Sequence, residues 1–374
     1  MNSEWASWLT RWSDAGLIDG ATADRIRAFE QERAGQRRLR WPILVALAFG
    51  ALMVGGGVLL FVAAHWDALS PAQRFAIVLL MVGAFHAGGV ASVDRFPAMS
   101  TTLHAIGSVA LGAGIALSGQ IFHLDEHWPG GIMLWALGTG LAWWLLRDTP
   151  QMVLFAVLAP AWLGAEWIAA TGDSPHDAAE RVLATGALLQ ALTYFTAAGS
   201  GRAGEVRRAL VWIGGLALPP IAIAAAFAAS SDWHRGAAPS PISLAIGTAV
   251  SLAVPLAVAY GLRRTAAWSN AAAAGWVLAL FWMAGLSTAI PLYGWWAVGA
   301  VGLVAWGLRD GRTERINMGA AVFAATVFAF YFSEVMDKLG RSASLIGLGL
   351  LFLAGGWALE RLRRRLVDQA RGAA

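Results

Sequence analysis

The chain contains no cysteine and little charge. The absence of cysteine in 374 residues excludes disulfides, thiolate metal sites and cysteine nucleophiles. Charged residues make up only 13% of the chain, whereas soluble domains carry about a quarter, and hydrophobic residues reach 58%. The formal charge of +4 belongs to basic residues beside apolar stretches, which argues against nucleic-acid binding. The composition therefore predicts an integral membrane protein, and we expect no cofactor.

Apolar stretches of helical length run through nearly the whole chain. A helix needs about 20 such residues to cross the hydrocarbon layer, and the joining loops are too short for a folded domain outside the membrane. We predict an all-α, polytopic membrane protein with about twelve transmembrane helices. A break at Pro291 divides two of them, and a mere kink there would give about eleven. The predicted spans are 43–64, 74–93, 102–121, 130–146, 151–170, 182–198, 209–229, 242–261, 271–290, 292–308, 316–332 and 343–360.

Basic residues fall unequally on the two sides of such a bundle. Sorting the links alternately places 22 of the 27 Lys and Arg residues on one side. This bias follows the positive-inside rule, so we expect both termini in the cytoplasm and the protein in the bacterial inner membrane. The predicted organisation is a transmembrane domain over 41–360 and a basic cytoplasmic tail over 361–374. The other side carries Arg74, Arg181, Arg235, Lys338 and Arg341.

The first 40 residues predict a helical hairpin outside the spans. Gly16 can end a first helix in the left-handed conformation, and Asp19 or Thr22 can cap a second. Either the two helices pack on each other, or the pair docks on anionic lipid or on a partner protein. The first helix has an apolar stripe of Trp5, Trp8, Leu9 and Trp12.

Three strings are the most specific in the chain. A glycine-rich first span ends in His65-Trp66-Asp67, and the third span ends in Gln120 followed by His123. The third string runs from 331 to 365 around the last span. By the predicted topology, the first two strings end on the outer side, where we expect a functional polar cluster. Its members are His65, Trp66, Asp67, Gln120 and His123.

These strings and the pattern around Gly16 resemble an uncharacterised bacterial membrane-protein family, domain of unknown function 2157. The resemblance covers the N-terminal third and the last span. In that family an asparagine usually precedes the Trp-Asp pair, and His65 takes its place here. The resemblance implies a multi-span inner-membrane protein and no particular activity.

A zinc-like pattern lies in the same outer region. His123, Glu126 and His127 fit the spacing H-x-x-E-H. Zinc chemistry also requires both histidines on one face of a stable helix and a third ligand, whereas this loop is short and Pro129 follows it. We therefore expect no catalytic metal site and no enzyme. The alternatives are a non-catalytic divalent site with His65, Asp67, Asp125 or Glu126, or solvated interfacial residues.

Four polar residues are placed inside the predicted spans, where such groups are costly and informative. Adjacent antiparallel spans can bring His86 and His104 together, while Glu166 and Gln190 lie on later spans. A proton-coupled transporter needs such a set, but these groups can also serve packing alone. The set contains no arginine–carboxylate pair.

Two functions of different classes follow from these observations. The first is transport of a small solute or lipid, which would place His86, Glu166 or Gln190 on a polar cavity. The second is an envelope scaffold or sensor that works through a protein partner and has a dry, closed bundle. The lipid bilayer is the expected environment, and either function is compatible with a membrane-protein partner or a homo-oligomer.

Overall fold

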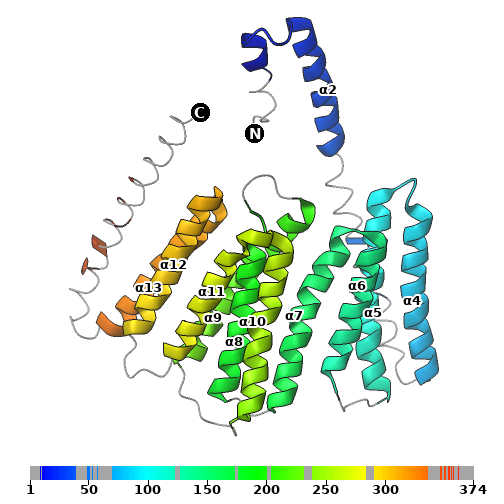
Figure 1. The fold of residues 1–374 in the computed structure, drawn as a ribbon. Helices are drawn as coiled ribbons and strands as arrows, with labels where there is room; N and C mark the ends of the chain where they lie inside the picture. Colours follow the sequence, from blue (N-terminus) through cyan, green and yellow to red (C-terminus); the bar gives the residue numbers. More distant parts are fainter. Residues whose placement is uncertain are drawn as a thin grey trace. The chain divides into compact units, whose positions relative to one another are not determined.

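The described part of the chain is helical throughout in the computed structural model (Figure 1). The structure describes residues 11–38, 70–122, 127–172, 176–199, 204–230, 238–283 and 290–335, together with isolated positions near both ends. The helices are α2 (Gly20–Arg38), α4 (Pro71–Ser92), α5 (Pro97–Phe122), α6 (Pro129–Leu146), α7 (Thr149–Thr171), α8 (Asp177–Phe195), α9 (Glu205–Ser230), α10 (Pro241–Arg263), α11 (Trp268–Met283), α12 (Ile290–Asp310) and α13 (Thr313–Phe330). A 3₁₀ turn (Arg264–Ala267) precedes α11, and a π-helical turn (Tyr331–Val335) follows α13.

Eight segments of the described residues are long and apolar enough to cross a membrane. One of them, Pro241–Met283, contains both α10 and α11, and α8 is not among the eight. The all-α class and the membrane-spanning character are therefore confirmed. The count of about twelve and the cytoplasmic termini remain predictions, since the first and last predicted spans lie largely outside the described residues.

The predicted division of this region into two helices is confirmed, because α11 ends at Met283 and α12 begins at Ile290, with Pro291 in the first turn of α12. Trp276 of α11 donates its indole N–H to the carbonyl of Trp295 in α12 at 2.9 Å. In turn, Trp295 donates its indole N–H to the carbonyl of Trp276, also at 2.9 Å. Because the two bonds join positions 19 apart in sequence, α11 and α12 pack side by side and do not form one kinked helix.

Helix starts follow from short capping signals. Ser70 and Gln73 form a capping box at the start of α4, with Pro71 at the first helical turn. Ser240 accepts the N–H of Ser243 at the start of α10 in the same manner. These polar caps satisfy N–H groups that a membrane helix cannot pair internally.

The predicted N-terminal turn is confirmed in the described residues 11–38. Gly16 has φ +67°, and Leu17 donates its backbone N–H to the Trp12 carbonyl at 3.0 Å, as in a Schellman ending. Asp19 accepts the backbone N–H of Thr22 at 2.8 Å and so caps α2. Hydrogen bonding from Thr22 lowers the pKa of the Asp19 carboxyl, which favours its charged form as a cap.

The chain divides into two compact units, residues 1–162 and 163–374, and we describe each separately. In unit 1, α4 packs along α5, and α5 packs along α6. A small core of Val78, Met81 and Ala110 joins α4 to α5, and Trp135 of α6 donates to the Ser108 carbonyl at 2.7 Å. The helices of this unit run in alternating directions (Figure 1).

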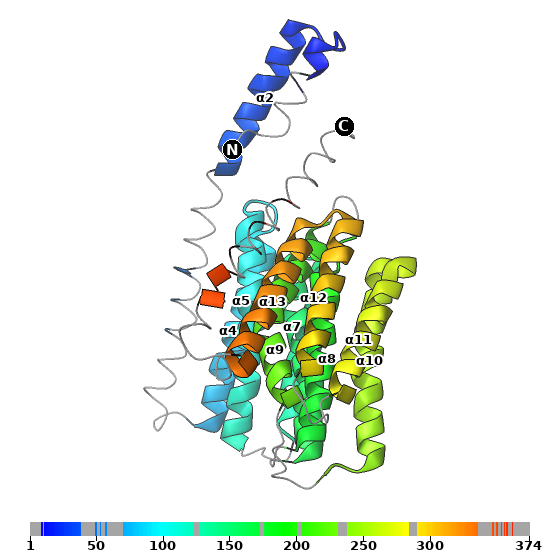
Figure 2. The same cartoon turned by 90° about the vertical axis from the view of Figure 1, so that its left-hand side faces the viewer.

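Unit 2 is built around α8. This helix contacts α9, α10 and α11, and Figure 2 shows it among its neighbours. Residues 188–198 are all buried, so this segment is covered on every side, its polar residues included. In the core of the unit, Leu188 and Phe195 of α8 pack with Leu218 of α9 and Val277 of α11. A second pair, α12 and α13, makes extensive contact along its length.

The contact between α8 and α9 depends on a close backbone approach at Gly214. A Cβ at this position would lie 2.2 Å from the Phe195 nitrogen and 2.6 Å from the Ala191 oxygen. These are backbone atoms and cannot rotate away. Small residues permit such approaches in membranes, where helices gain no hydrophobic drive to associate.

We predict that Gly214→Ala destabilises unit 2 by about 1–3 kcal/mol, because the added methyl group forces the two backbones apart. The matched control is Gly261→Ala, at an exposed helical position with nothing within 4 Å of the added Cβ. That change should stabilise slightly, since alanine is the better helix former. Unfolding in mixed detergent micelles measures both, and equal stabilities of the two variants would contradict the prediction.

Candidate functional site: an arginine cluster beside an apolar crevice

Three helices of unit 2, α10, α12 and α13, converge on one carboxylate, that of Asp310 at the end of α12. Its Oδ2 accepts from Arg263 of α10 at 2.8 Å and from Arg315 of α13 at 2.6 Å. Trp306 donates its indole N–H to the same oxygen at 3.1 Å, and Arg309 donates Nε to Oδ1 at 3.2 Å. The side chains of Arg263 and Arg315 are 2% and 0% exposed, so their charges depend on this carboxylate and not on water.

The same arginines bind the backbone where α8 ends. The last carbonyl groups of a helix have no partner within it, and water cannot replace one in a buried position. Here the cationic donors also oppose the negative end of the helix dipole. Arg263 donates to the Thr196 carbonyl at 2.6 Å, Arg315 to the Ala198 carbonyl, and Arg312 to the Gly199 carbonyl at 2.7 Å.

Helix α11 is attached to this end of unit 2 as well. Asn270, fully buried, donates to the Thr196 hydroxyl at 3.1 Å. Arg309 donates Nη2 to the Ser269 hydroxyl at 2.8 Å, and its guanidinium lies 4.7 Å from the ring centre of Trp268. We call Arg263, Arg309, Asp310, Arg312 and Arg315 with these carbonyls the arginine cluster.

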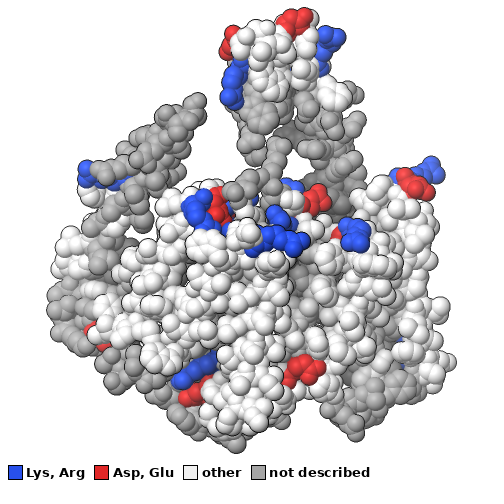
Figure 3. Space-filling model, in the orientation of Figure 1, with Lys and Arg blue, Asp and Glu red and all other residues white. Residues whose placement is uncertain are grey.

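Sequence reasoning missed this cluster. The positive-inside rule accounts for its arginines only as the basic side of the bundle, and Figure 3 shows exposed Lys and Arg side chains gathered on that side. The arginine–carboxylate pairs of the cluster lie at the span ends, where Asp310 binds Arg263 and Arg315. The signal that was available is Asp310, a lone acidic residue between Arg309 and Arg312.

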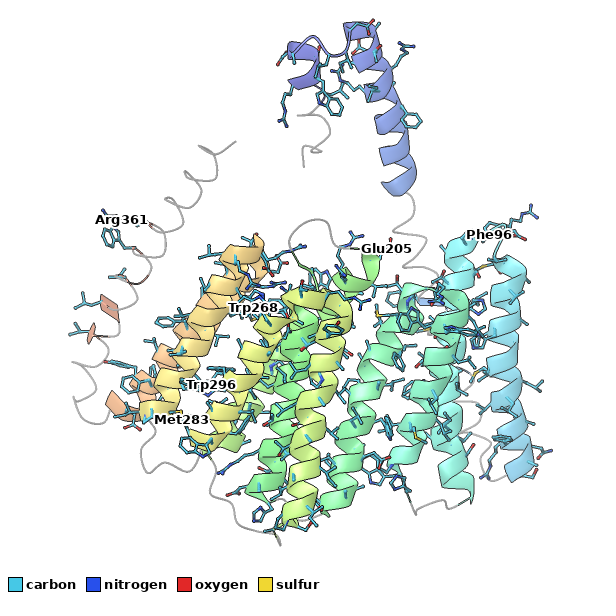
Figure 4. All side chains as sticks on the ribbon, in the orientation of Figure 1. Phe96, Glu205, Trp268, Met283, Trp296 and Arg361 are labelled. Carbon is cyan, nitrogen blue, oxygen red and sulfur yellow. The ribbon has the colours of Figure 1, made fainter. Side chains whose placement is uncertain are left out.

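An apolar crevice of about 390 Å³ adjoins the cluster. It lies between α11 and α12, and its inner wall comes from α8 and α9. Its polar end contains Ser269 and Arg309, while the remainder is alkyl and aromatic. Figure 4 shows Trp268 and Trp296, which both line it, at different levels of the helix pair. The volume falls within the range of about 300–1,000 Å³ of small-molecule sites.

The predicted meeting of two histidines is confirmed in unit 1. The Nδ1 atoms of His86 in α4 and His104 in α5 lie 3.0 Å apart. For a hydrogen bond at this distance, Nδ1 of one ring must carry a proton and Nδ1 of the other must be unprotonated. The contact is therefore incompatible with two doubly protonated, cationic rings. Each ring lies over a glycine of the opposite helix, where a Cβ would come within 2.8 Å: His104 over Gly89, and His86 over Gly107.

A carboxyl group lies near this pair, in the link between α6 and α7. Asp148 accepts the backbone N–H of Gln151 at 3.2 Å and so caps α7. Burial raises the pKa of Asp148, although the nearby His104 and the cap bond oppose this shift. Gln151 is fully buried, and both polar atoms of its side chain lack a partner among the described residues.

The other residues predicted from sequence do not join these sites. Glu166 is partly buried in α7, and Gln190 is buried in α8; neither lines the crevice. Gln120 lies on the last turn of α5, and His127 lies exposed before α6. Five predicted residues fall outside the described part of the chain: His65, Trp66, Asp67, His123 and Glu126.

No group of three or more His, Asp or Glu residues that could hold a metal ion occurs within the residues that the structure describes. The H-x-x-E-H pattern is not tested by this observation, because His123 and Glu126 are outside those residues.

The described helices define a helical membrane protein, and the family comparison agrees. The model of the family described as "Predicted membrane protein (DUF2157)" matches residues 10–152. The predicted resemblance is thereby confirmed over the N-terminal part of the chain; the last span lies beyond the matched residues. Neither the curated proteins nor the solved structures contained a match to the chain.

We predict that Asp310→Asn costs about 3–5 kcal/mol of stability, because Arg263 and Arg315 would keep their buried charges without a counter-charge. The control is Glu314→Gln, which removes a carboxylate 3.8 Å from Arg312 that is 39% exposed. That change should cost about 0–1 kcal/mol. Unfolding in mixed micelles measures both, and an Asp310→Asn protein as stable as its control would refute the prediction.

A double-mutant cycle tests the histidine pair. We expect His86→Ala and His104→Ala to be non-additive, with a coupling of about 0.5–1.5 kcal/mol for one hydrogen bond. Each single variant removes the same bond, so the second change costs less once the first is present. Additive effects on the free energy of unfolding would show that the two rings do not depend on each other.

Proposed function

We propose that this membrane protein binds a lipid-like amphiphile from the bilayer in the crevice between α11 and α12. The observation that carries the proposal is the crevice itself: an apolar space with a single polar end, built between membrane helices. Lipid handling is thus favoured over carriage of a small polar solute.

The lining supports this choice. A polar solute crossing a membrane needs polar partners along its site, since unpaired polar groups are costly in hydrocarbon. The walls of the crevice are formed by residues such as Leu192, Leu218 and Trp276. None of the three polar residues predicted to line a solute cavity, His86, Glu166 and Gln190, contributes to it.

The position of the crevice supports entry from the side. Trp268 and Val298 line it and are 62% and 54% exposed, so its rim belongs to the lateral surface of the helix pair. Gly302 also lines it, and nothing lies within 4 Å of a Cβ added there. The acyl chain of a lipid in the surrounding bilayer can therefore reach the crevice without first entering water.

The expected setting is the bacterial inner membrane. The arginine cluster lies at the end of unit 2 that the positive-inside rule assigns to the cytoplasm, and Figure 3 supports this assignment through the concentration of basic side chains there. A protein partner or a homo-oligomer remains a prediction from the sequence.

Filling the crevice tests the proposal. Gly302→Leu places a side chain in the open space, and we expect the apparent affinity for dioleoyl phosphatidylglycerol to fall by about tenfold or more. The matched control is Gly294→Leu, the same change on the same helix, where an added Cβ also meets nothing and no part of the crevice is touched. Native mass spectrometry of the purified proteins with added lipid measures the occupancy.

Equal lipid occupancy in the wild-type protein, Gly302→Leu and Gly294→Leu would refute the proposal. That result would instead favour the scaffold or sensor, which works through a protein partner and needs no lipid in this crevice. Circular dichroism of each variant in the same detergent shows whether a change in occupancy reflects loss of fold.

A further inference from the structure

We propose that the occupant of the crevice is an anionic phospholipid whose phosphate binds Arg309. This inference rests on the proposed function and adds the chemical class of the ligand and the residue that selects it. It follows from the positions of three charged side chains, the exposure of one of them, and the length of the crevice.

The polar end of the crevice has an excess of positive charge. Three guanidinium groups, those of Arg263, Arg309 and Arg315, bind the single carboxylate of Asp310, which leaves a formal charge of +2. An anion of matching geometry is the group that such an excess attracts.

Arg309 is the member of this set that an anion can reach. Its side chain is 40% exposed, whereas those of Arg263 and Arg315 are 2% and 0% exposed. It also lines the crevice, while the two buried arginines do not. The most accessible charge of the cluster therefore lies at the mouth of the apolar space.

The guanidinium of Arg309 is already oriented. Nη2 donates to Ser269, Nε donates to Asp310, and the group lies over the exposed ring of Trp268. Nη1 has no acceptor among the residues that the structure describes, so it can donate to a phosphate oxygen without breaking either bond. A tryptophan ring at this level also suits the headgroup layer of a bilayer.

The dimensions suit an acyl chain below such a headgroup. Arg309 and Trp296 both line the crevice and lie 13 positions apart on α12, a rise of about 20 Å. One leaflet of the hydrocarbon core is about 15 Å thick. A phosphate at Arg309 thus places its chain along the helix axis, as in the surrounding bilayer.

The experiment is a competition between two lipids with the same acyl chains, dioleoyl phosphatidylglycerol and dioleoyl phosphatidylcholine. Native mass spectrometry of the full-length protein in detergent gives the occupancy of each. We expect the wild-type protein to prefer the anionic lipid by about fivefold, the contribution of one arginine near a charged surface. Arg309→Gln should abolish the preference while phosphatidylcholine still binds, and Arg309→Lys should retain it.

The matched control is Arg208→Gln, which removes an exposed basic residue of α9 at the same end of unit 2. It should leave the preference unchanged, so a loss there would mean that only the overall charge matters and would overturn the assignment to Arg309. Glycerol phosphate is added in a separate arm. If it displaced the lipid at millimolar concentration, a free phosphate compound and not a phospholipid would be the ligand.

Failure of this inference differs from failure of the proposed function. Equal binding of the two lipids by the wild-type protein, with loss of both in Gly302→Leu, would overturn the anionic assignment and leave lipid binding intact. If Gly302→Leu left lipid occupancy unchanged, both the anionic assignment and the proposed function would be overturned.

Discussion

The carbonyl groups that end α8 must find hydrogen-bond donors inside the protein, and unit 2 is organised around that need. Residues 188–198 are buried, so water is not available along this segment. Arginine is suited to the task because one guanidinium can serve a carbonyl and a carboxylate at once. Arg263 does this with Thr196 and Asp310, and Arg315 with Ala198 and the same carboxylate.

This solution links helices that are far apart in sequence. Thr196 and Arg315 are 119 residues apart in sequence, yet Arg315 donates a hydrogen bond of 3.3 Å to the Thr196 carbonyl. The end of α8 is thereby connected to α10, α12 and α13, and its last turn also packs on α9 at Gly214. The buried charges are expensive to desolvate, so they contribute a fixed arrangement of helix ends more than net stability. Apolar packing along the helices, for example between Leu188 and Val277, supplies the remaining cohesion.

Local signals in the sequence predicted local structure well. Gly16, Asp19 and the division between α11 and α12 near Pro291 each depend on a few neighbouring residues, and the structure confirms them. The contact of His86 with His104 also followed, because antiparallel neighbours place positions equidistant from their link side by side. The arginine cluster did not follow: its members come from three separate links, and a basic residue beside a span already has a sufficient explanation in topology. Nor could the crevice be predicted, since it depends on how α11 and α12 pack against α8.

The geometry at the end of α12 connects these two missed features. Successive residues of a helix point about 100° apart, so Arg309 and Asp310 face different neighbours although they adjoin in sequence. Asp310 faces the buried arginines of α10 and α13, and Arg309 faces Ser269 and the crevice. The bond from Arg309 Nε to Asp310 Oδ1 joins the two sides. A phosphate bound at Nη1 of Arg309 would leave this bond in place, so the same side chain can hold the carboxylate on one side and a ligand on the other.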